Sequence, residues 1–219
     1  MLRSIIFKIA LGLWFVLWSP ALLISLITPE STRWAMLREA EVILWLARVI
    51  AGIRYEVIGA PAPNAIIASK HMSLMDTTIL PLCSPNVFFI IKRELTWIPI
   101  YGWVFRRLGF IGVDRRRGAT NMKALADAAA RKIRSGMTLI IFPEGTRVRP
   151  GAGVHLRRGL LFIAETAGIK IQPVGLDTGR LWPKRGRVMG GVAHVWFEEP
   201  LPPNATLDEV TQAIARHSA

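Results

Sequence analysis

The chain has 219 residues, of which 52% are hydrophobic, and it carries a formal net charge of +13. Its length predicts one domain with a short extension, and its basic balance favours phosphate-bearing partners such as nucleic acid, anionic lipid headgroups or phosphorylated small molecules. The single cysteine, Cys83, excludes an intrachain disulfide, and the four scattered histidines form no metal-ligand pattern with it.

Residues 1–52 are predicted to form a hydrophobic membrane anchor of two helices. The stretch from Ile9 to Ile27 has 19 residues without a charge, close to the ~20 that a helix needs to span a bilayer. A signal peptide is the competing interpretation, although no clean cleavage site follows the apolar run. Pro20 is expected to kink or break the helix, and a broken helix would lie in one leaflet instead of spanning the bilayer.

The second helix of this segment is predicted from Ser31 to about Ile50. Its apolar residues share one face and its arginines the other, although Glu39 interrupts the apolar face. This pattern fits a helix at the membrane surface, with Trp34 and Trp45 at the lipid–water interface. It fits equally a helix that packs against the protein core.

From Ile53 onward the sequence alternates between short apolar strands and helices, which predicts an α/β domain over residues 53–219. The expected architecture is a mixed, mostly parallel central sheet flanked by helices. Strands are predicted at 53–58, 65–68, 87–91, 110–113, 138–142, 171–175 and 192–197. Helices are predicted at 120–134, at about 156–168, and after the capping box that opens at residue 206.

Three of these strands lead into polar clusters. His71 and Asp76 follow the second strand, Lys92 and Arg93 follow the third, and the segment 144–147 follows the fifth. The carboxyl ends of parallel strands lie on one edge of a sheet, where α/β proteins bind ligands. Together the clusters offer a base, an acid that orients it, and cations suited to a substrate with both a hydroxyl and a phosphate.

The spacing of His71 and Asp76 has two interpretations. Residues five apart point about 140° away from each other on a continuous helix, so the two meet only if His71 precedes the helix and Asp76 lies in its first turn. Ser73 supplies that helix start through a Ser-x-x-Asp capping box. The pair then forms a general base held by a carboxylate. Alternatively, Asp76 only caps the helix and His71 is an exposed loop residue.

The pattern His71-x-x-x-x-Asp76, followed by Phe-Pro-Glu-Gly-Thr-Arg at 142–147, resembles the glycerolipid acyltransferase family and within it the 1-acylglycerol-3-phosphate acyltransferases. The segments 92–102 and 171–174 resemble the second and fourth blocks of that family, and the matching blocks span about residues 65–175. Two departures leave substrate choice open. Lys70 stands where an asparagine is more frequent, and Val148 stands where a serine often follows the arginine.

This resemblance implies transfer of a fatty acyl group from an acyl thioester to the sn-2 hydroxyl of 1-acylglycerol-3-phosphate (lysophosphatidic acid), which gives phosphatidic acid in phospholipid biosynthesis. His71 would take the hydroxyl proton, and Asp76 would hold the imidazole and balance its charge. No acyl-enzyme and no cofactor are implied. Acyl-CoA or an acyl carrier protein (acyl-ACP) would be the co-substrate.

The resemblance also implies a set of substrate-binding residues: Arg147, Glu144, Gly145, Thr146, Lys92, Arg93 and Arg158. Arg147 is the first choice for the substrate phosphate, because its planar fork matches phosphate oxygens. Lys92 and Arg93 are second choices, and each fits a solvated face equally well. Glu144 is expected either to bond the glycerol part or to fix its loop.

Two further functions fit the sequence: the same chemistry on another lysolipid such as a lyso-ornithine lipid, and a non-catalytic membrane-bound protein that binds anionic lipid. The basic runs at 115–117 and 184–187 are expected to face anionic lipid or an acidic acyl donor. No nucleic acid partner is expected, because the tryptophans cluster in the apolar N-terminus and not among the arginines. The expected location is the cytoplasmic face of the cytoplasmic membrane.

Overall fold

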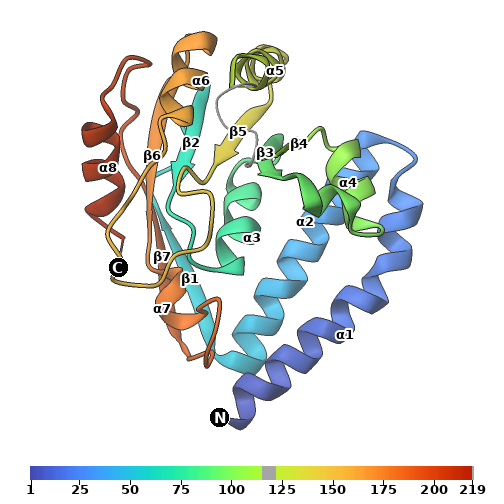
Figure 1. Ribbon diagram of the computed structural model, residues 1–219. Helices are drawn as coiled ribbons and strands as arrows, with labels where there is room; N and C mark the ends of the chain where they lie inside the picture. The colour runs from blue at the N-terminus through green and yellow to red at the C-terminus, as the bar shows by residue number, and fades with distance from the viewer. Residues whose placement is uncertain (115–121, 219) are drawn as a thin grey trace.

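The computed structural model describes residues 1–114 and 122–218, and its centre is a seven-stranded sheet in the order β1-β7-β6-β2-β5-β3-β4 (Figure 1). Every neighbouring pair is parallel except β6 and β7, which are antiparallel. The predicted mixed, mostly parallel sheet is therefore confirmed. The strands are β1 (Ile53–Ile58), β2 (Ala65–Ser69), β3 (Val87–Lys92), β4 (Ile111–Val113), β5 (Thr138–Ile141), β6 (Lys170–Leu176) and β7 (Gly191–Phe197).

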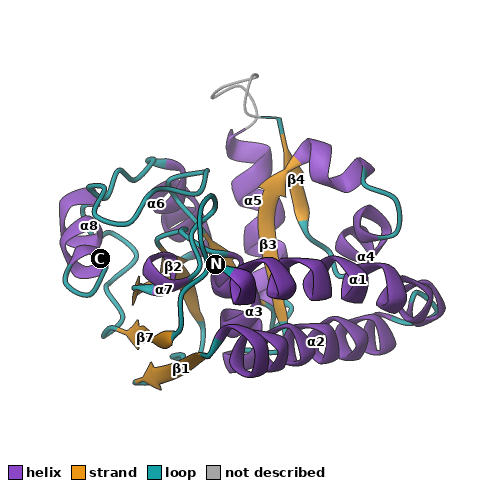
Figure 2. Ribbon diagram, turned by 90° about the horizontal axis from the view of Figure 1, so that it is seen from below, coloured by secondary structure: helices purple, strands orange, loops and turns teal. Residues whose placement is uncertain are grey.

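Helices cover both faces of this sheet, and β2 shows why (Figure 2). All five residues of β2 are buried, as expected for a central parallel strand. Side chains alternate across a strand, so Ile67 enters one hydrophobic cluster and Ile66 the other. The first cluster lies towards the N-terminal helices and α3 (Leu74–Cys83). The second includes residues of α5 (Met122–Arg134), α6 (Gly159–Ala167) and α8 (Leu207–Ala215).

The first helix, α1 (Leu2–Ser25), runs through Pro20 without interruption, so the expected break is wrong. Proline has no N–H to donate to the carbonyl of Val16 four residues earlier. The hydroxyl of Ser19 donates to that carbonyl at 2.7 Å and takes the place of the missing donor. Among the described residues, α1 is the one helix long and apolar enough to cross a membrane, and most of its large apolar side chains are exposed.

The second helix, α2 (Pro29–Leu46), continues as a π-helical turn, η1 (Ala47–Ala51), before β1 begins. One face of α2 packs into the protein, whereas Trp34 and Trp45 are exposed, so features of both predicted environments occur in one helix. Glu39, which interrupts the apolar pattern, is buried and accepts a 2.5 Å hydrogen bond from the hydroxyl of Tyr101 in α4 (Tyr101–Arg107). Burial raises the pKa of Glu39 to about 7.

The N-terminal helices share a core with the sheet. Phe7 of α1 is fully buried, and its ring meets Trp182 edge to face with centroids 4.7 Å apart. Trp182 directly follows the short helix α7 (Thr178–Leu181). Because one hydrophobic cluster spans both segments, the division into an anchor (1–52) and an α/β domain (53–219) stays a prediction.

One predicted helix start differs from the structure, and the predicted helix cap at Thr120 is not tested by it. The helix expected from residue 156 begins at Gly159, because residues 143–158 form a loop in which Arg157 N donates to Pro143 O at 3.1 Å. The predicted capping residue Thr120 and the basic run 115–117 lie outside the described residues. The remaining short helix, η2 (Arg93–Trp97), is a 3₁₀ turn that follows β3 directly.

Candidate active site

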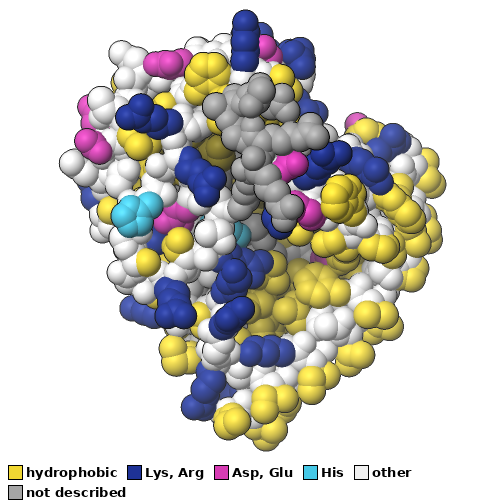
Figure 3. All heavy atoms as spheres, in the orientation of Figure 1, with side chains coloured by type: hydrophobic (Ala, Val, Ile, Leu, Met, Phe, Trp, Pro, Cys, Tyr) yellow, Lys and Arg dark blue, Asp and Glu magenta, His cyan; other side chains and the backbone are white. Residues whose placement is uncertain are grey.

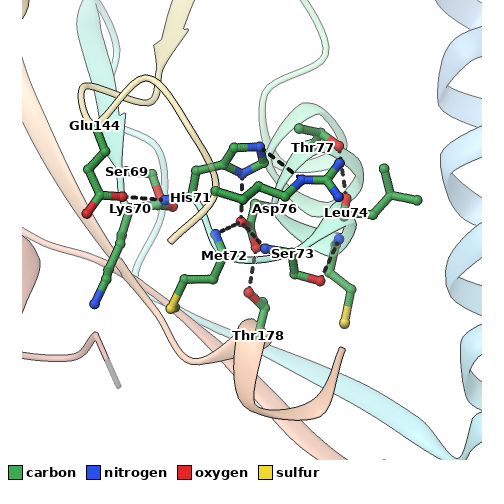
Figure 4. A network of polar contacts seen from close by, with 12 residues as sticks. Ser69, Lys70, His71, Met72, Ser73, Leu74, Asp76, Thr77, Glu144 and Thr178 are labelled. Atoms are coloured by element: carbon green, nitrogen blue, oxygen red, sulfur yellow. Dashed lines mark hydrogen bonds and ion pairs between the residues drawn. The ribbon is translucent and has the colours of Figure 1, made fainter. Parts of the chain in front are cut away.

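Two of the three predicted polar clusters meet at the carboxyl edge of β2 and β5, which are adjacent parallel strands (Figure 4). β2 ends at Ser69, and the chain then runs through Lys70 and His71 into α3. β5 ends at Ile141, and the loop that follows carries Glu144 and Arg147. The structure therefore brings together the first and third of the three clusters that the sequence singles out.

Asp76 both caps α3 and contacts His71, so the two interpretations of this spacing describe one side chain. Its Oδ2 atom lies 3.0 Å from His71 Nδ1. The same oxygen accepts hydrogen bonds from the backbone N–H groups of Met72 at 2.7 Å and Ser73 at 2.8 Å. Ser73 caps the helix, as predicted. Asp76 is fully buried, so its charge is held by these donors instead of by water.

Asp76 and Phe142 hold the ring of His71, and the second ring nitrogen, Nε2, faces the carboxyl edge of the sheet. The ring stacks on Phe142, with centroids 4.2 Å apart and planes inclined by 19°. Its Nδ1 faces Asp76, and Arg147 Nε donates to its Nε2 at 3.4 Å. Only 15% of the side chain is exposed. Nε2 is therefore the nitrogen at which a substrate hydroxyl would lose a proton.

Thr178 completes this cluster and was missed by the sequence analysis. Its hydroxyl donates to Asp76 Oδ1 at 2.5 Å, and both side chains are fully buried. Thr178 follows the end of β6, the other parallel neighbour of β2, so it comes from the same edge of the sheet. The carboxyl ends of parallel strands meet at one edge, so the place of Thr178 just after β6 is the one sequence signal for it, and that signal does not identify its partner.

Glu144 fixes the loop that carries His71. Its Oε2 accepts a hydrogen bond from the backbone N–H of His71 at 3.2 Å. Its Oε1 is buried and has no hydrogen-bond partner in the described part of the chain. Burial raises the pKa of Glu144, and the His71 N–H bond and the charge of Lys70 oppose that change. The next residue, Gly145, has a φ of 75°, which suits glycine and turns the chain sharply after β5.

Lys70 points away from the imidazole (Figure 4). The side chain is buried, and its Nζ donates to the carbonyl of Ala152 at 2.7 Å. Burial lowers the pKa of Lys70, and the neighbouring Glu144 opposes this. Lys70 thus tethers the loop after β5 to the end of β2.

The remaining predicted residues do not join the cluster. Lys92 forms an ion pair with Glu94 at 3.2 Å, and the Arg93 guanidinium lies 5.8 Å from the ring centroid of Trp97. Thr146 is exposed, as is Arg158, which precedes α6. Roles for Lys92, Arg93, Thr146 and Arg158 at the substrate remain predictions.

The surface beside the site combines apolar and basic groups. Figure 3 shows a hollow between the α/β part and the N-terminal helices, with hydrophobic side chains over its floor and Lys and Arg side chains along one rim. Within the described residues, no group of three or more His, Cys, Asp or Glu side chains could hold a metal ion. The arrangement therefore suits proton transfer by His71 beside a surface that accepts an apolar, anionic molecule.

A mostly parallel α/β sheet with a carboxylate-held imidazole at its carboxyl edge is an arrangement suited to general-base chemistry. The acyltransferase family profile matches residues 54–177. A 1-acyl-sn-glycerol-3-phosphate acyltransferase of Pseudomonas aeruginosa is 32% identical over 84% of this chain and 74% of its own length. A lyso-ornithine lipid O-acyltransferase of the same organism is 27% identical over 89% of this chain and 81% of its own length.

The fold has a solved counterpart. The crystal structure of the 1-acyl-sn-glycerophosphate (LPA) acyltransferase PlsC from Thermotoga maritima superposes with a TM-score of 0.77 at 25% identity, covering 98% of this chain and 94% of that one. The chain belongs to the acyltransferase family, and it is an acyltransferase. The family resemblance carried by the His71–Asp76 and 142–147 motifs is thereby confirmed.

Proposed function

We propose that this acyltransferase moves a fatty acyl group from an acyl thioester to the sn-2 hydroxyl of 1-acylglycerol-3-phosphate, giving phosphatidic acid. One observation carries the proposal: the cation Arg147 lies 3.4 Å from the nitrogen of His71 that would act as base. A base and a guanidinium at this separation suit an acceptor in which a hydroxyl and a phosphate are close together. The names of the P. aeruginosa and T. maritima relatives point to the same acceptor.

The chemistry follows from the contacts of His71. Its Nε2 takes the proton of the sn-2 hydroxyl while the hydroxyl oxygen attacks the thioester carbonyl. Asp76, held by Nδ1 of the ring, stabilises the imidazolium that forms. The C–S bond then breaks, and the thiolate leaves with little acid assistance because thiol pKa values lie near ~8.5. The proton on His71 finally passes to the released thiolate, which becomes the free thiol, so the base is restored and no cofactor is needed.

Arg147 gives the acceptor phosphate a second effect. Its Nε donates to His71 Nε2, the position that the substrate hydroxyl has to occupy. A phosphate binds a guanidinium more strongly than a neutral imidazole does, because the phosphate offers charged oxygens in a matching planar geometry. Binding of the phosphate therefore draws Arg147 off the ring and exposes the base together with its substrate.

The proposed location is the cytoplasmic face of the cytoplasmic membrane, where a membrane lysolipid meets a soluble thioester. In support, α1 carries no charged residue after Lys8 and exposes large side chains such as Leu13 and Leu17. Trp34 and Trp45 of α2 are exposed as well, and tryptophan favours the lipid–water interface. Either acyl-CoA or acyl-ACP would approach from the aqueous side.

A lyso-ornithine lipid is the second candidate acceptor, because a relative with that activity in its name matches more of this chain than the first relative does. Its headgroup has no phosphate, and the anion at Arg147 would be the carboxylate of ornithine, which a guanidinium also binds in a planar geometry. Family membership leaves the non-catalytic lipid-binding alternative without support.

The test is an assay of the purified full-length protein with labelled acyl-CoA or acyl-ACP. The acceptors are 1-acylglycerol-3-phosphate, the matched 1-acylglycerol without phosphate, and a lyso-ornithine lipid. We expect transfer to be fastest with the phosphate-bearing acceptor. Equal or faster transfer to lyso-ornithine lipid would replace the proposed acceptor, and thioester hydrolysis without transfer to any acceptor would overturn the proposed reaction.

A further inference from the structure

We propose that Thr178 is a positioning residue for the carboxylate of Asp76, and that the Asp177–His194 pair holds Thr178 in place. The inference rests on the proposed role of His71 as the base. It concerns a residue 102 positions away in the sequence from the carboxylate that it contacts.

The two oxygens of Asp76 are held in different ways. Oδ2 has three nearby donors, all from the segment 71–73. Oδ1 is held by the hydroxyl of Thr178, its one hydrogen-bond donor among the described residues, at 2.5 Å. Contacts from residues 71–73 thus fix the position of Oδ2, and the hydrogen bond from Thr178 to Oδ1 fixes the rotation of the carboxylate. Without that donor, Oδ1 would be a buried charged oxygen lacking a partner, which is costly.

Thr178 is itself held by its neighbour. The carboxylate of Asp177 accepts hydrogen bonds from the backbone N–H of His194 at 2.6 Å and from Arg180 at 3.0 Å, and it lies 3.1 Å from His194 Nδ1. His194 belongs to β7, the antiparallel neighbour of β6. Two consecutive residues therefore reach in different directions, Asp177 to β7 and Thr178 to Asp76.

The next residue shows how closely α7 approaches the catalytic loop. A Cβ atom added to Gly179 would lie 2.5 Å from Met72 Cβ and 3.3 Å from Pro150 Cγ. Real Cβ contacts are not this short, so only glycine permits this packing. Met72 directly follows His71, and Pro150 follows Arg147 in the same loop. Helix α7 therefore packs directly against both segments that carry the proposed catalytic and binding residues.

The hydroxyl of Thr178 also has an electrostatic effect. It presents the positive end of its O–H dipole to Asp76, which offsets part of the negative charge that the carboxylate presents to the imidazole. The other charged groups at the pair are Arg147, on His71 Nε2, and Glu144, on the His71 backbone. The ammonium group of Lys70 lies away from the pair and donates to the carbonyl of Ala152. The carboxylate of Asp177 accepts a hydrogen bond from the backbone N–H of His194 in β7. Removing the hydroxyl therefore leaves the full charge of Asp76 facing the ring, which strengthens its attraction for the imidazolium.

Three substitutions separate the hydroxyl from the shape of the side chain. Thr178→Ser and Thr178→Ala both lose the methyl group and differ only in the hydroxyl, so they form a matched pair. Thr178→Val keeps the shape and removes the hydroxyl. We expect kcat to fall about tenfold in the Ala and Val variants, as for the loss of one hydrogen bond to a charged group, and to stay near wild type in Ser. KM for the acyl thioester should not change.

A second measurement does not depend on activity. Diethyl pyrocarbonate modifies neutral imidazole, so the rate at which it labels His71, followed by peptide mass spectrometry against pH, reports the proton on that ring. The midpoint should move to higher pH in Thr178→Ala and Thr178→Val and stay in place in Thr178→Ser. The acid limb of the pH–rate profile should move in the same direction.

The outcomes are distinct. Equal activity losses in Ser and Ala with an unchanged labelling midpoint would reduce Thr178 to a packing residue and overturn the inference. Wild-type behaviour in all three variants would do the same while leaving the proposed function intact. A wild-type protein that labels as expected but transfers no acyl group would refute the proposed function alone.

Discussion

Arg147 Nε lies 3.4 Å from His71 Nε2, the ring nitrogen opposite the one that Asp76 holds. The cation proposed for the substrate phosphate thus contacts the nitrogen proposed as the base. Under the proposed function this contact would link acceptor recognition to chemistry, because a group that withdraws the guanidinium would also expose the base.

Replacing His71 with alanine should abolish acyl transfer while leaving membrane association intact. General-base catalysis contributes about 10²- to 10⁴-fold, so the remaining rate should fall by at least that range. Activity is measured with labelled thioester, and membrane association by flotation with vesicles. His217→Ala is the matched control, since His217 lies near the C-terminus and contacts Glu198. Substantial transfer by the His71 variant would refute the base assignment.

Replacing Arg147 with alanine should lower transfer to 1-acylglycerol-3-phosphate by about 10- to 100-fold, as expected for losing a hydrogen-bonded ion pair. Transfer to the matched 1-acylglycerol should change little or rise, because the guanidinium no longer occupies His71 Nε2. Arg149→Ala removes an exposed arginine two residues away and serves as the control. An equal loss with both acceptors would rule out the phosphate role of Arg147.

The stability of the folded protein should fall between pH 4.5 and about 7 because of Glu39. Its ordinary pKa is 4.5, and burial raises it to about 7 in the folded state. In this window the folded state keeps a proton that the unfolded state has lost, so stability decreases by about 1.4 kcal/mol per pH unit and is level above about 7. The free energy of unfolding, measured in detergent at a series of pH values, tests this dependence.

Glu39→Gln should remove this part of the pH dependence, because glutamine stays neutral and can still accept the hydrogen bond from Tyr101. Glu41→Gln, an exposed change on the same helix, should leave the dependence in place. An unchanged slope in the Glu39 variant would show that this carboxyl is ionised in the folded protein throughout the window.

Phe7→Ala should destabilise the whole protein by about 3–5 kcal/mol, because Phe7 is fully buried against Trp182. Phe162→Ala removes a partly exposed phenylalanine from α6 and should cost clearly less. Denaturant unfolding followed by a probe in the α/β part gives the comparison. Similar small losses would mean that α1 is joined to the sheet only loosely.

Local patterns predicted much of the fold and part of the site. The contact between His71 and Asp76 was predictable because the two residues are five positions apart and a capping box places the start of the helix between them. The sheet followed from short apolar runs alternating with helices. The break expected at Pro20 did not occur because the Ser19 hydroxyl replaces a backbone donor, a detail that periodicity does not carry.

Contacts between distant segments could not be predicted in the same way. Thr178 and Glu39 have no local signature, since one reaches across 102 positions to Asp76 and the other across 62 to Tyr101. Lys92 and Arg93 matched a family block, yet their described partners are Glu94 and Trp97. Which polar side chains meet depends on strand order, and strand order is set by packing of the whole sheet.

The contact of Phe7 with Trp182 has a consequence for how this enzyme reaches its substrate. A helix held by a flexible linker would let the catalytic part swing above the bilayer and sample lipids at many depths. Here the N-terminal end of α1 packs against Trp182, the residue that follows α7. If α1 lies in the membrane as proposed, this contact holds the candidate active site at one fixed distance from the bilayer. On the proposed membrane placement, the lysolipid has to come to the site at that distance, and lateral diffusion of lipid sets the rate of encounter.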